Sequence, residues 1–121
     1  MSNPCSARAS VVAVVVTYHP DMALLPQVLA SVQDQVDAVV VVDNGTTGSA
    51  LAAWMGRWQA AGRCWIANPD NRGIASAINQ GIAVAAAQGG SHVLIMDQDS
   101  TLQPGMVASL LAASHAESGN Q

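Results

Sequence analysis

Residues 11–17 have the sequence Val-Val-Ala-Val-Val-Val-Thr, an apolar run that would place hydrophobic side chains on both faces of a strand. Such a strand is typical of a parallel sheet covered by helices, because both of its faces must be buried. A second run of this kind, residues 38–42, is followed by the turn-forming sequence Asp43-Asn44-Gly45. Between the two runs, apolar residues recur at helical spacing over residues 22–35. This segment therefore predicts a strand, a helix and a second strand.

The same alternation continues to the end of the chain. Spacing and composition predict helices over 51–62 and 74–89, strands over 64–67 and 92–96, and a last helix with Pro104 in its first turn. The order β-α-β-α-β-α-β-α is typical of the α/β class, with a mostly parallel sheet flanked by helices. At 121 residues, the chain is expected to form a single domain.

The charge balance excludes several kinds of partner. Acidic residues outnumber basic ones eight to four, and the four basic residues are scattered arginines. A nucleic-acid binder or a polybasic membrane patch needs a concentration of positive charge that this chain lacks. A bound phosphate would have to rely on backbone N–H groups or on a metal ion.

The expected location is the cytoplasm, since the sequence shows neither a signal peptide nor an apolar run of the ~20 residues that span a bilayer. Cys5 and Cys64 have no metal-binding or disulfide-framework spacing, and two thiols in a reducing compartment are the simplest interpretation.

Polar residues gather where the predicted strands end. The strand interiors contain almost no polar residues, whereas the segments 17–19, 43–44, 68–71 and 97–99 are rich in them. Ligands of open α/β sheets bind beyond the carboxyl ends of the strands. We therefore expect these four segments to meet at one ligand-binding edge.

Asp97 and Asp99 are the most informative pair at this edge. Two bare carboxylates ~6 Å apart repel by about 3 kcal/mol at an effective dielectric constant of ~20, and a cation between them removes this cost. Oxygen ligands favour Mg²⁺ or Mn²⁺, which complete their coordination with water and phosphate oxygens. The spacing predicts a metal site that binds a diphosphate. The alternative is that Asp-x-Asp merely forms a turn and caps a helix.

The other candidates each have a structural alternative. Asp43 is suited to accept a hydrogen bond from a base or a ribose, or else it only forms the turn with Asn44. Thr17 and Tyr18 would line a base pocket, or would simply end the strand. Three residues of the following loop, Asn71, Arg72 and Gly73, would offer side chains and helix N-terminal N–H groups to a phosphate, although Asx turns and a solvated arginine explain them equally well.

Taken in order, these segments resemble the N-terminal half of inverting family 2 glycosyltransferases, which have the GT-A fold. The resemblance covers about residues 10–113, and rests on the segments 14–18, 41–44, 71–73 with Asn79 and Gly81, and 97–99. Residues 92–100 and 17–20 are further similar to the rhamnosyltransferase branch.

The resemblance implies a role for each residue. Asp43 would contact the base, the loop around Asn71 would line the nucleotide pocket, Asp97 would face the ribose or sugar, and Asp99 would bind the metal ion with Asp97 beside it. The donor would be a deoxythymidine diphosphate rhamnose. The acceptor would be a saccharide or a lipid-linked sugar, used in bacterial surface polysaccharide synthesis at the cytoplasm or the inner face of the cell membrane.

The chain departs from the family pattern in one respect. An inverting transfer needs a general base, which the family supplies as an acid well beyond the Asp-x-Asp. Here Glu117 is the sole carboxylate after Asp99, so the chain is interpreted as the truncated N-terminal part of a longer enzyme, inactive alone. Two alternatives are a sugar-nucleotide pyrophosphorylase, which normally has a Gly-rich basic loop after the first strand, and a non-catalytic nucleotide-binding or receiver-like module.

Overall fold

The predicted alternation of strands and helices is confirmed. A computed structural model describes residues 10–119, with side chains as far as Ser114. Its elements are β1 (Val11–Thr17), α1 (Leu25–Gln33), β2 (Ala38–Asp43), α2 (Ala50–Trp58), β3 (Arg63–Ala67), α3 (Ile74–Ala87), β4 (His92–Asp97) and α4 (Met106–Gly119).

The four strands form one parallel sheet in the order β3-β2-β1-β4. The chain winds outward from β1 through β2 to β3, and then crosses to the opposite side of β1 to form β4. The strand order thus reverses between β1 and β4. In open α/β sheets, the crevice at such a reversal, beyond the carboxyl ends of the strands, is the usual place for a ligand.

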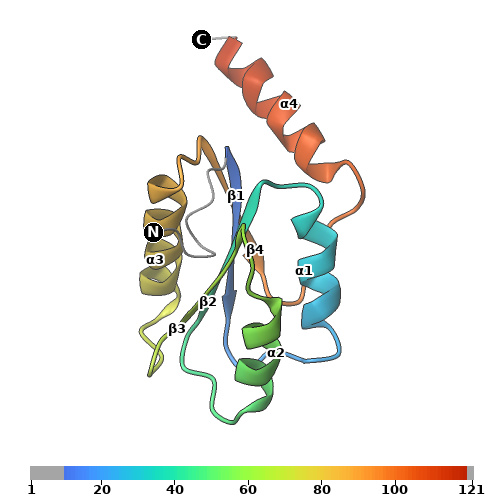
Figure 1. The fold of residues 1–121 in the computed structure, drawn as a ribbon. Coiled ribbons are helices and arrows are strands. Elements are labelled where there is room, and N and C mark those ends of the chain that lie inside the picture. The colour runs from blue at the N-terminus through green and yellow to red at the C-terminus, as the bar shows by residue number, and fades with distance from the viewer. Residues whose placement is uncertain (1–9, 120–121) are drawn as a thin grey trace.

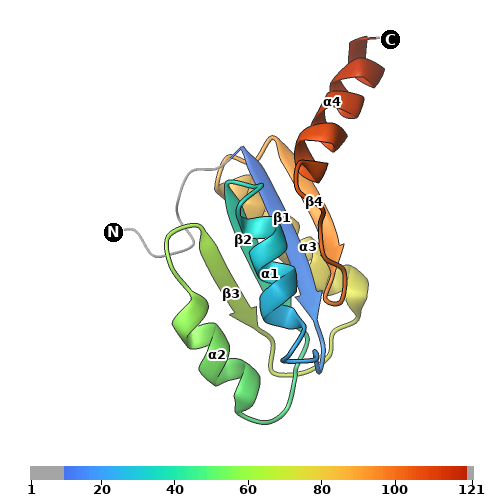
Figure 2. The ribbon, with the colours of Figure 1, turned by 90° about the vertical axis from the view of Figure 1, so that its right-hand side faces the viewer.

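Helices cover both faces of the sheet. Figures 1 and 2 show α1 and α2 on one face and α3 on the other. Alternate residues of β1 serve the two layers: Ala13 and Val15 pack toward α1 and α2, whereas Val12 and Val14 pack toward α3. All four side chains are fully buried. The β1 strand is therefore apolar on both faces because it is the centre of two cores.

Gly81 lets α3 approach the sheet closely. A Cβ atom at this position would overlap the side chain of Val14 on β1. Ala77 and Ala85, one helical turn before and after it, are fully buried against the same face. This row of small residues brings α3, and the loop that precedes it, against the carboxyl ends of β1 and β2.

Two helices begin later than the sequence predicted. The α1 helix begins at Leu25 rather than at residue 22, with Pro26 in its first turn, where a missing N–H is tolerated. The α4 helix begins at Met106, so the placement of Pro104 in its first turn was wrong. Gly105 has a φ of 79° and interrupts the helical geometry.

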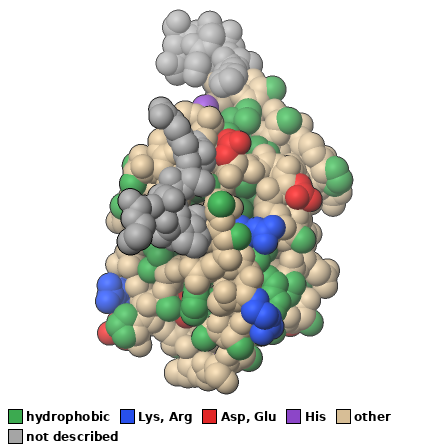
Figure 3. Space-filling view, viewed as in Figure 1, with side chains coloured by type: hydrophobic (Ala, Val, Ile, Leu, Met, Phe, Trp, Pro, Cys, Tyr) green, Lys and Arg blue, Asp and Glu red, His purple; other side chains and the backbone are tan. Residues whose placement is uncertain are grey.

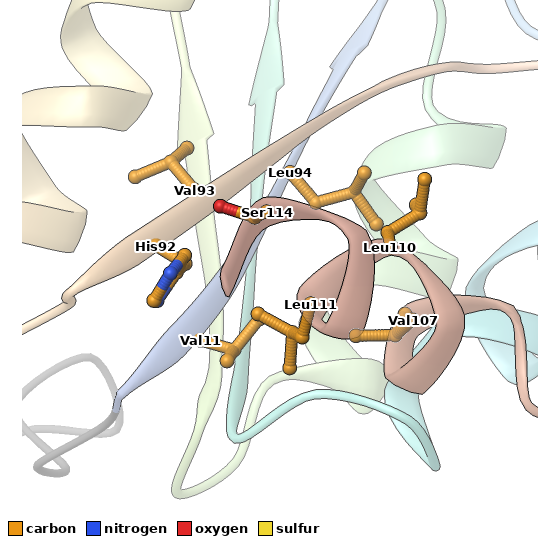
Figure 4. Close-up of a pocket in the computed structure, with 8 residues that line it drawn as sticks. All are labelled: Val11, His92, Val93, Leu94, Val107, Leu110, Leu111 and Ser114. Carbon is orange, nitrogen blue, oxygen red and sulfur yellow. The ribbon is translucent and has the colours of Figure 1, made fainter. Parts of the chain in front are cut away.

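The α4 helix leans over the amino ends of β1 and β4. An apolar crevice of about 210 Å³ lies between them. Figure 4 shows the α4 side chains Val107, Leu110 and Leu111 near Val11 and Leu94 of the strands. This crevice is at the opposite end of the sheet from the strand reversal described above.

Two findings bear on location. None of the helices within residues 10–119 is long and apolar enough to cross a bilayer. Cys64 is disulfide-bonded in the structure, so the expected thiol at this position was wrong. Cys5 lies outside the described residues.

Candidate functional site

A cavity of about 500 Å³ opens at the carboxyl ends of β1 and β4, where the strand order reverses. It is lined by residues from all the segments that the sequence predicted to converge: Val16, Thr17, Tyr18, Asn44, Asn71, Ile74, Asp97, Gln98 and Asp99. Six of these are predicted site residues, namely Thr17, Tyr18, Asn44, Asn71, Asp97 and Asp99. The cavity therefore brings together most of the candidate site.

Asp97 and Asp99 both line this cavity, and both side chains are exposed. Asp97 is the last residue of β4, paired in register with Val16 of β1, and Asp99 lies in the turn that follows. Neither carboxylate is hidden behind a helix. Both are accessible to a ligand that occupies the cavity.

The donor set suits a hard cation that shares its coordination with a ligand. Within the described part of the chain, no cluster of three or more His, Cys, Asp or Glu side chains is arranged to hold a metal ion. Zinc sites usually need three or four protein ligands. Mg²⁺ binds through one or two carboxylates and takes its remaining ligands from water and substrate phosphates. The pair Asp97 and Asp99 fits the second type.

Tyr18 reaches the cavity from the end of β1. Its side chain is half exposed, and its ring meets the His19 ring edge to face at a centroid distance of 4.4 Å. His19 has a φ of 46°, the sole positive φ of a non-glycine residue in the described chain. The backbone turns sharply here as it leaves the sheet. The exposed Tyr18 ring is a suitable stacking surface for a planar base.

Asp43 lies below the cavity rather than on its wall. It is 3% exposed, and it shares a sheet face with Val39 and Val41, the face covered by α1 and α2. One carboxylate oxygen accepts hydrogen bonds from the hydroxyls of Thr17 (2.7 Å) and Thr46 (2.6 Å). The other oxygen accepts the backbone N–H of Thr46 (2.7 Å). These three bonds fix the carboxylate beside the end of β1, where Asp43 pairs in register with Thr17.

A network of buried amides supports the other wall. Asn44 donates from its side chain to the Gly73 carbonyl (3.0 Å) and accepts the Arg72 N–H (3.2 Å). Asn68 and Gln80 exchange two hydrogen bonds between their side-chain amides, of 2.7 and 2.9 Å. The Asn44 bonds tie the end of β2 to the loop before α3 and hold this loop in place, and the Asn68 bonds tie the end of β3 to the middle of α3.

The loop residues divide into two groups. Asn71 lines the cavity, and its side chain accepts the Gly73 N–H at 2.8 Å in an Asx turn. Arg72 and Gly73 are not among the residues that line it. The Arg72 side chain forms an exposed ion pair with Asp70 at 3.4 Å. Figure 3 shows the positive side chains of one face as separate spots rather than as a stripe.

Four residues that shape the site were not among the sequence candidates: Thr46, Ile74, Gln80 and Gln98. Thr46 and Gln80 hold other site residues through the hydrogen bonds described above. Gln98 lies between the two acids in the sequence, but its bonds to the Tyr18 backbone can be seen only in the structure. Ile74 is 62% exposed on the cavity wall, which hydrophobicity alone would not predict.

Comparison with known proteins identifies the family. The model of the family "Glycosyl transferase family 2" matches residues 12–119, nearly the whole chain. The chain belongs to glycosyl transferase family 2. This family 2 chain is also similar in fold to a solved structure of S. aureus TarS 1-349, with 20% identity and a TM-score of 0.63. The match covers 85% of this chain and 31% of that one, so the chain spans about a third of its structural relative.

No curated protein matched this family 2 chain. The family assignment confirms the resemblance seen in the sequence at the level of the family, and the structural likeness confirms the GT-A type of fold. Neither comparison identifies the rhamnosyltransferase branch, and neither tests the roles of individual residues. The pyrophosphorylase and receiver-like alternatives lose their support, because the matching family is a different one.

Proposed function

We propose that this chain is the donor-binding part of a glycosyltransferase and that it binds a nucleoside diphosphate sugar together with a divalent cation. The observation that carries the proposal is the position of Asp97 and Asp99. Both exposed carboxylates face one cavity at the strand reversal, beside the exposed ring of Tyr18. Family membership supplies the reaction class, which is transfer of a sugar from an activated donor.

Each wall of the cavity suits a different part of such a donor. Asp97 and Asp99 would hold Mg²⁺ or Mn²⁺, which when bound neutralises the diphosphate and favours its departure. Tyr18 would contact the base, and Asn71 would accept or donate hydrogen bonds along the nucleotide. Asp43 would contribute by fixing the Thr17 hydroxyl, and its carboxylate could accept a further hydrogen bond from the nucleotide. Arg72 and Gly73, which do not line the cavity, would act by holding the loop that presents Asn71.

Deoxythymidine diphosphate rhamnose is the donor that we propose, on the similarity of residues 17–20 and 92–100 to the rhamnosyltransferase branch. The acceptor would be a saccharide or a lipid-linked sugar in a surface polysaccharide pathway. The reaction would take place in the cytoplasm or at the inner face of the membrane. A carboxylate beyond residue 121 would act as the general base, as the resemblance to family 2 glycosyltransferases implies.

Calorimetric titration tests the core of this proposal. The chain is titrated with deoxythymidine diphosphate in Mn²⁺, in Mg²⁺, and after treatment with a chelator. We expect binding that depends on the metal, and a loss of at least tenfold in affinity when Asp97 and Asp99 are both changed to Asn, since the two anionic oxygen ligands that attract the cation are then lost.

The matched control is Asp34→Asn, which removes an exposed carboxylate at the end of α1, away from the cavity. This variant should bind as the wild type does. Equal affinity with and without metal would rule out the metal-diphosphate site. Competition among thymidine, uridine, adenosine and guanosine diphosphates tests the donor separately, and equal competition would refute a thymidine-specific site.

A further inference from the structure

Gln98, the residue between the two acids, lines the ligand-binding cavity, and its side-chain amide is bound to the backbone of Tyr18, just after β1. Its Oε1 accepts the Tyr18 N–H at 2.8 Å, and its Nε2 donates to the Tyr18 carbonyl at 3.2 Å. A single side-chain amide therefore satisfies both backbone polar groups of one residue. This is the pattern by which a neighbouring strand would bind Tyr18.

This contact continues the sheet beyond its last paired residues. The ladder of paired residues between β1 and β4 ends at Val16 and Asp97, after which no further residues of the two strands are paired. The Gln98 amide takes the place of a backbone partner and joins the segment after β4 to the segment after β1. Tyr18 is thereby held at a fixed distance from the turn that contains both acids.

Few other bonds hold this turn. Its own backbone bond, from the Ser100 N–H to the Asp97 carbonyl, is long at 3.4 Å. The next fixed point is Leu102, whose N–H donates to the Ser31 hydroxyl on α1 at 3.0 Å. Asp99 lies between these points, so the Gln98 side chain is the strongest restraint on its side of the turn.

The chemistry at this position calls for a neutral amide. Glutamate would keep the acceptor for the Tyr18 N–H, but it would lose the donor and would add a third negative charge beside Asp97 and Asp99. Methionine has a similar length and no amide. The two substitutions therefore separate the effect of the hydrogen bonds from the effect of charge.

We propose that Gln98 is a positioning residue, which holds Tyr18 and the Asp97–Asp99 turn in the single arrangement that binds a metal ion and a nucleoside diphosphate together. The inference rests on the proposed function, since it assigns Gln98 to the same site. It adds a role for the central residue of the acidic motif that depends on its hydrogen bonds to the Tyr18 backbone.

The test compares Gln98→Met with Gln103→Met, a matched change at an exposed glutamine of the same loop. Each variant is titrated with deoxythymidine diphosphate in Mn²⁺, and the hydrogen exchange of the Tyr18 amide is followed by NMR. For Gln98→Met we expect roughly tenfold weaker metal-dependent binding, the loss of two modest hydrogen bonds, and faster exchange at Tyr18. Gln103→Met should change neither, and thermal melting confirms that both variants fold.

The outcomes separate this inference from the proposed function. If the wild-type chain shows no metal-dependent binding, the proposed function fails, and the role of Gln98 fails with it. If the wild type binds but Gln98→Met binds equally well, or if Gln98→Met leaves the hydrogen exchange of the Tyr18 amide unchanged, the positioning role alone is overturned.

Discussion

The two ends of the sheet are built in different ways. At the carboxyl ends of the strands, a polar cavity of about 500 Å³ is surrounded by side chains that are fixed by hydrogen bonds. At the amino ends, a smaller crevice of about 210 Å³ lies beneath α4 and is lined mostly by valine and leucine. Both hollows border β1 and β4.

The difference shows why only one of these hollows is suited to a charged ligand. Directional bonds hold Asp43 and Asn44 in place and leave Asp97 and Asp99 exposed above them. Contacts in the crevice are nondirectional, so they stabilise the position of α4 without specifying the orientation of a ligand. The carboxyl end therefore combines a rigid base with free acceptors, which is what a metal-diphosphate site requires.

Removal of the buried Asp43 carboxylate is expected to have the largest effect on the polar end of the sheet. Asp43→Ala leaves the Thr17 hydroxyl and the Thr46 N–H without their acceptor in a buried setting. We expect the free energy of unfolding to fall by about 3 kcal/mol. Urea denaturation followed by circular dichroism measures the change.

An acceptor at the opposite end of the sheet provides the control. Asp37 is exposed, and its carboxylate accepts the N–H groups of Val11 (2.9 Å) and Ser10 (3.3 Å) at the start of β1. Since water can replace it there, Asp37→Ala should cost about 1 kcal/mol or less. Equal losses for the two variants would show that the polar end is no more rigid than the other.

Much of this fold could be predicted from the sequence, because its signals are local. The valine-rich strands 11–17 and 38–42 can be buried only inside a parallel sheet, and helical spacing marks the segments between them. The starts of α1 and α4 were placed too early, since periodicity does not show that α1 begins only at Leu25, beside Pro26, or that Gly105 interrupts the helical geometry before α4.

The site could be predicted as a set of strand ends, but not as a set of side-chain directions. Convergence at one edge follows from parallel strands, and it correctly brought Tyr18, Asn71 and the two acids together. Whether a residue faces the cavity depends on which face of the sheet it shares and on partners distant in sequence. Asp43 lies on the sheet face of Val39 and Val41 and binds Thr46, and Gln98 binds Tyr18, 80 residues away.

A substitution at Val107 measures how much the apolar crevice contributes to stability. Its side chain is 4% exposed where α4 meets the strands. Val107→Ala removes two methyl-sized groups, worth about 0.8 kcal/mol each, so the free energy of unfolding should fall by about 1.5 kcal/mol. Leu110 is half exposed on the same helix, so Leu110→Ala should lower the free energy of unfolding by less. Nucleotide affinity should be unchanged in both variants, because the crevice is remote from the cavity.

A substitution at Ile74 should change stability the least. It should also separate the role of this side chain in nucleotide binding from its role in packing. It is 62% exposed on the wall of the polar cavity, so Ile74→Ser should alter the free energy of unfolding by only about 0.5 kcal/mol. Loss of an apolar contact with the bound base or sugar should nevertheless weaken nucleotide binding by about three- to tenfold. Ile82, which is 40% exposed on the same α3 helix and does not line the cavity, is the control. An equal change in affinity for Ile82→Ser would mean that the helix, rather than the cavity wall, is responsible.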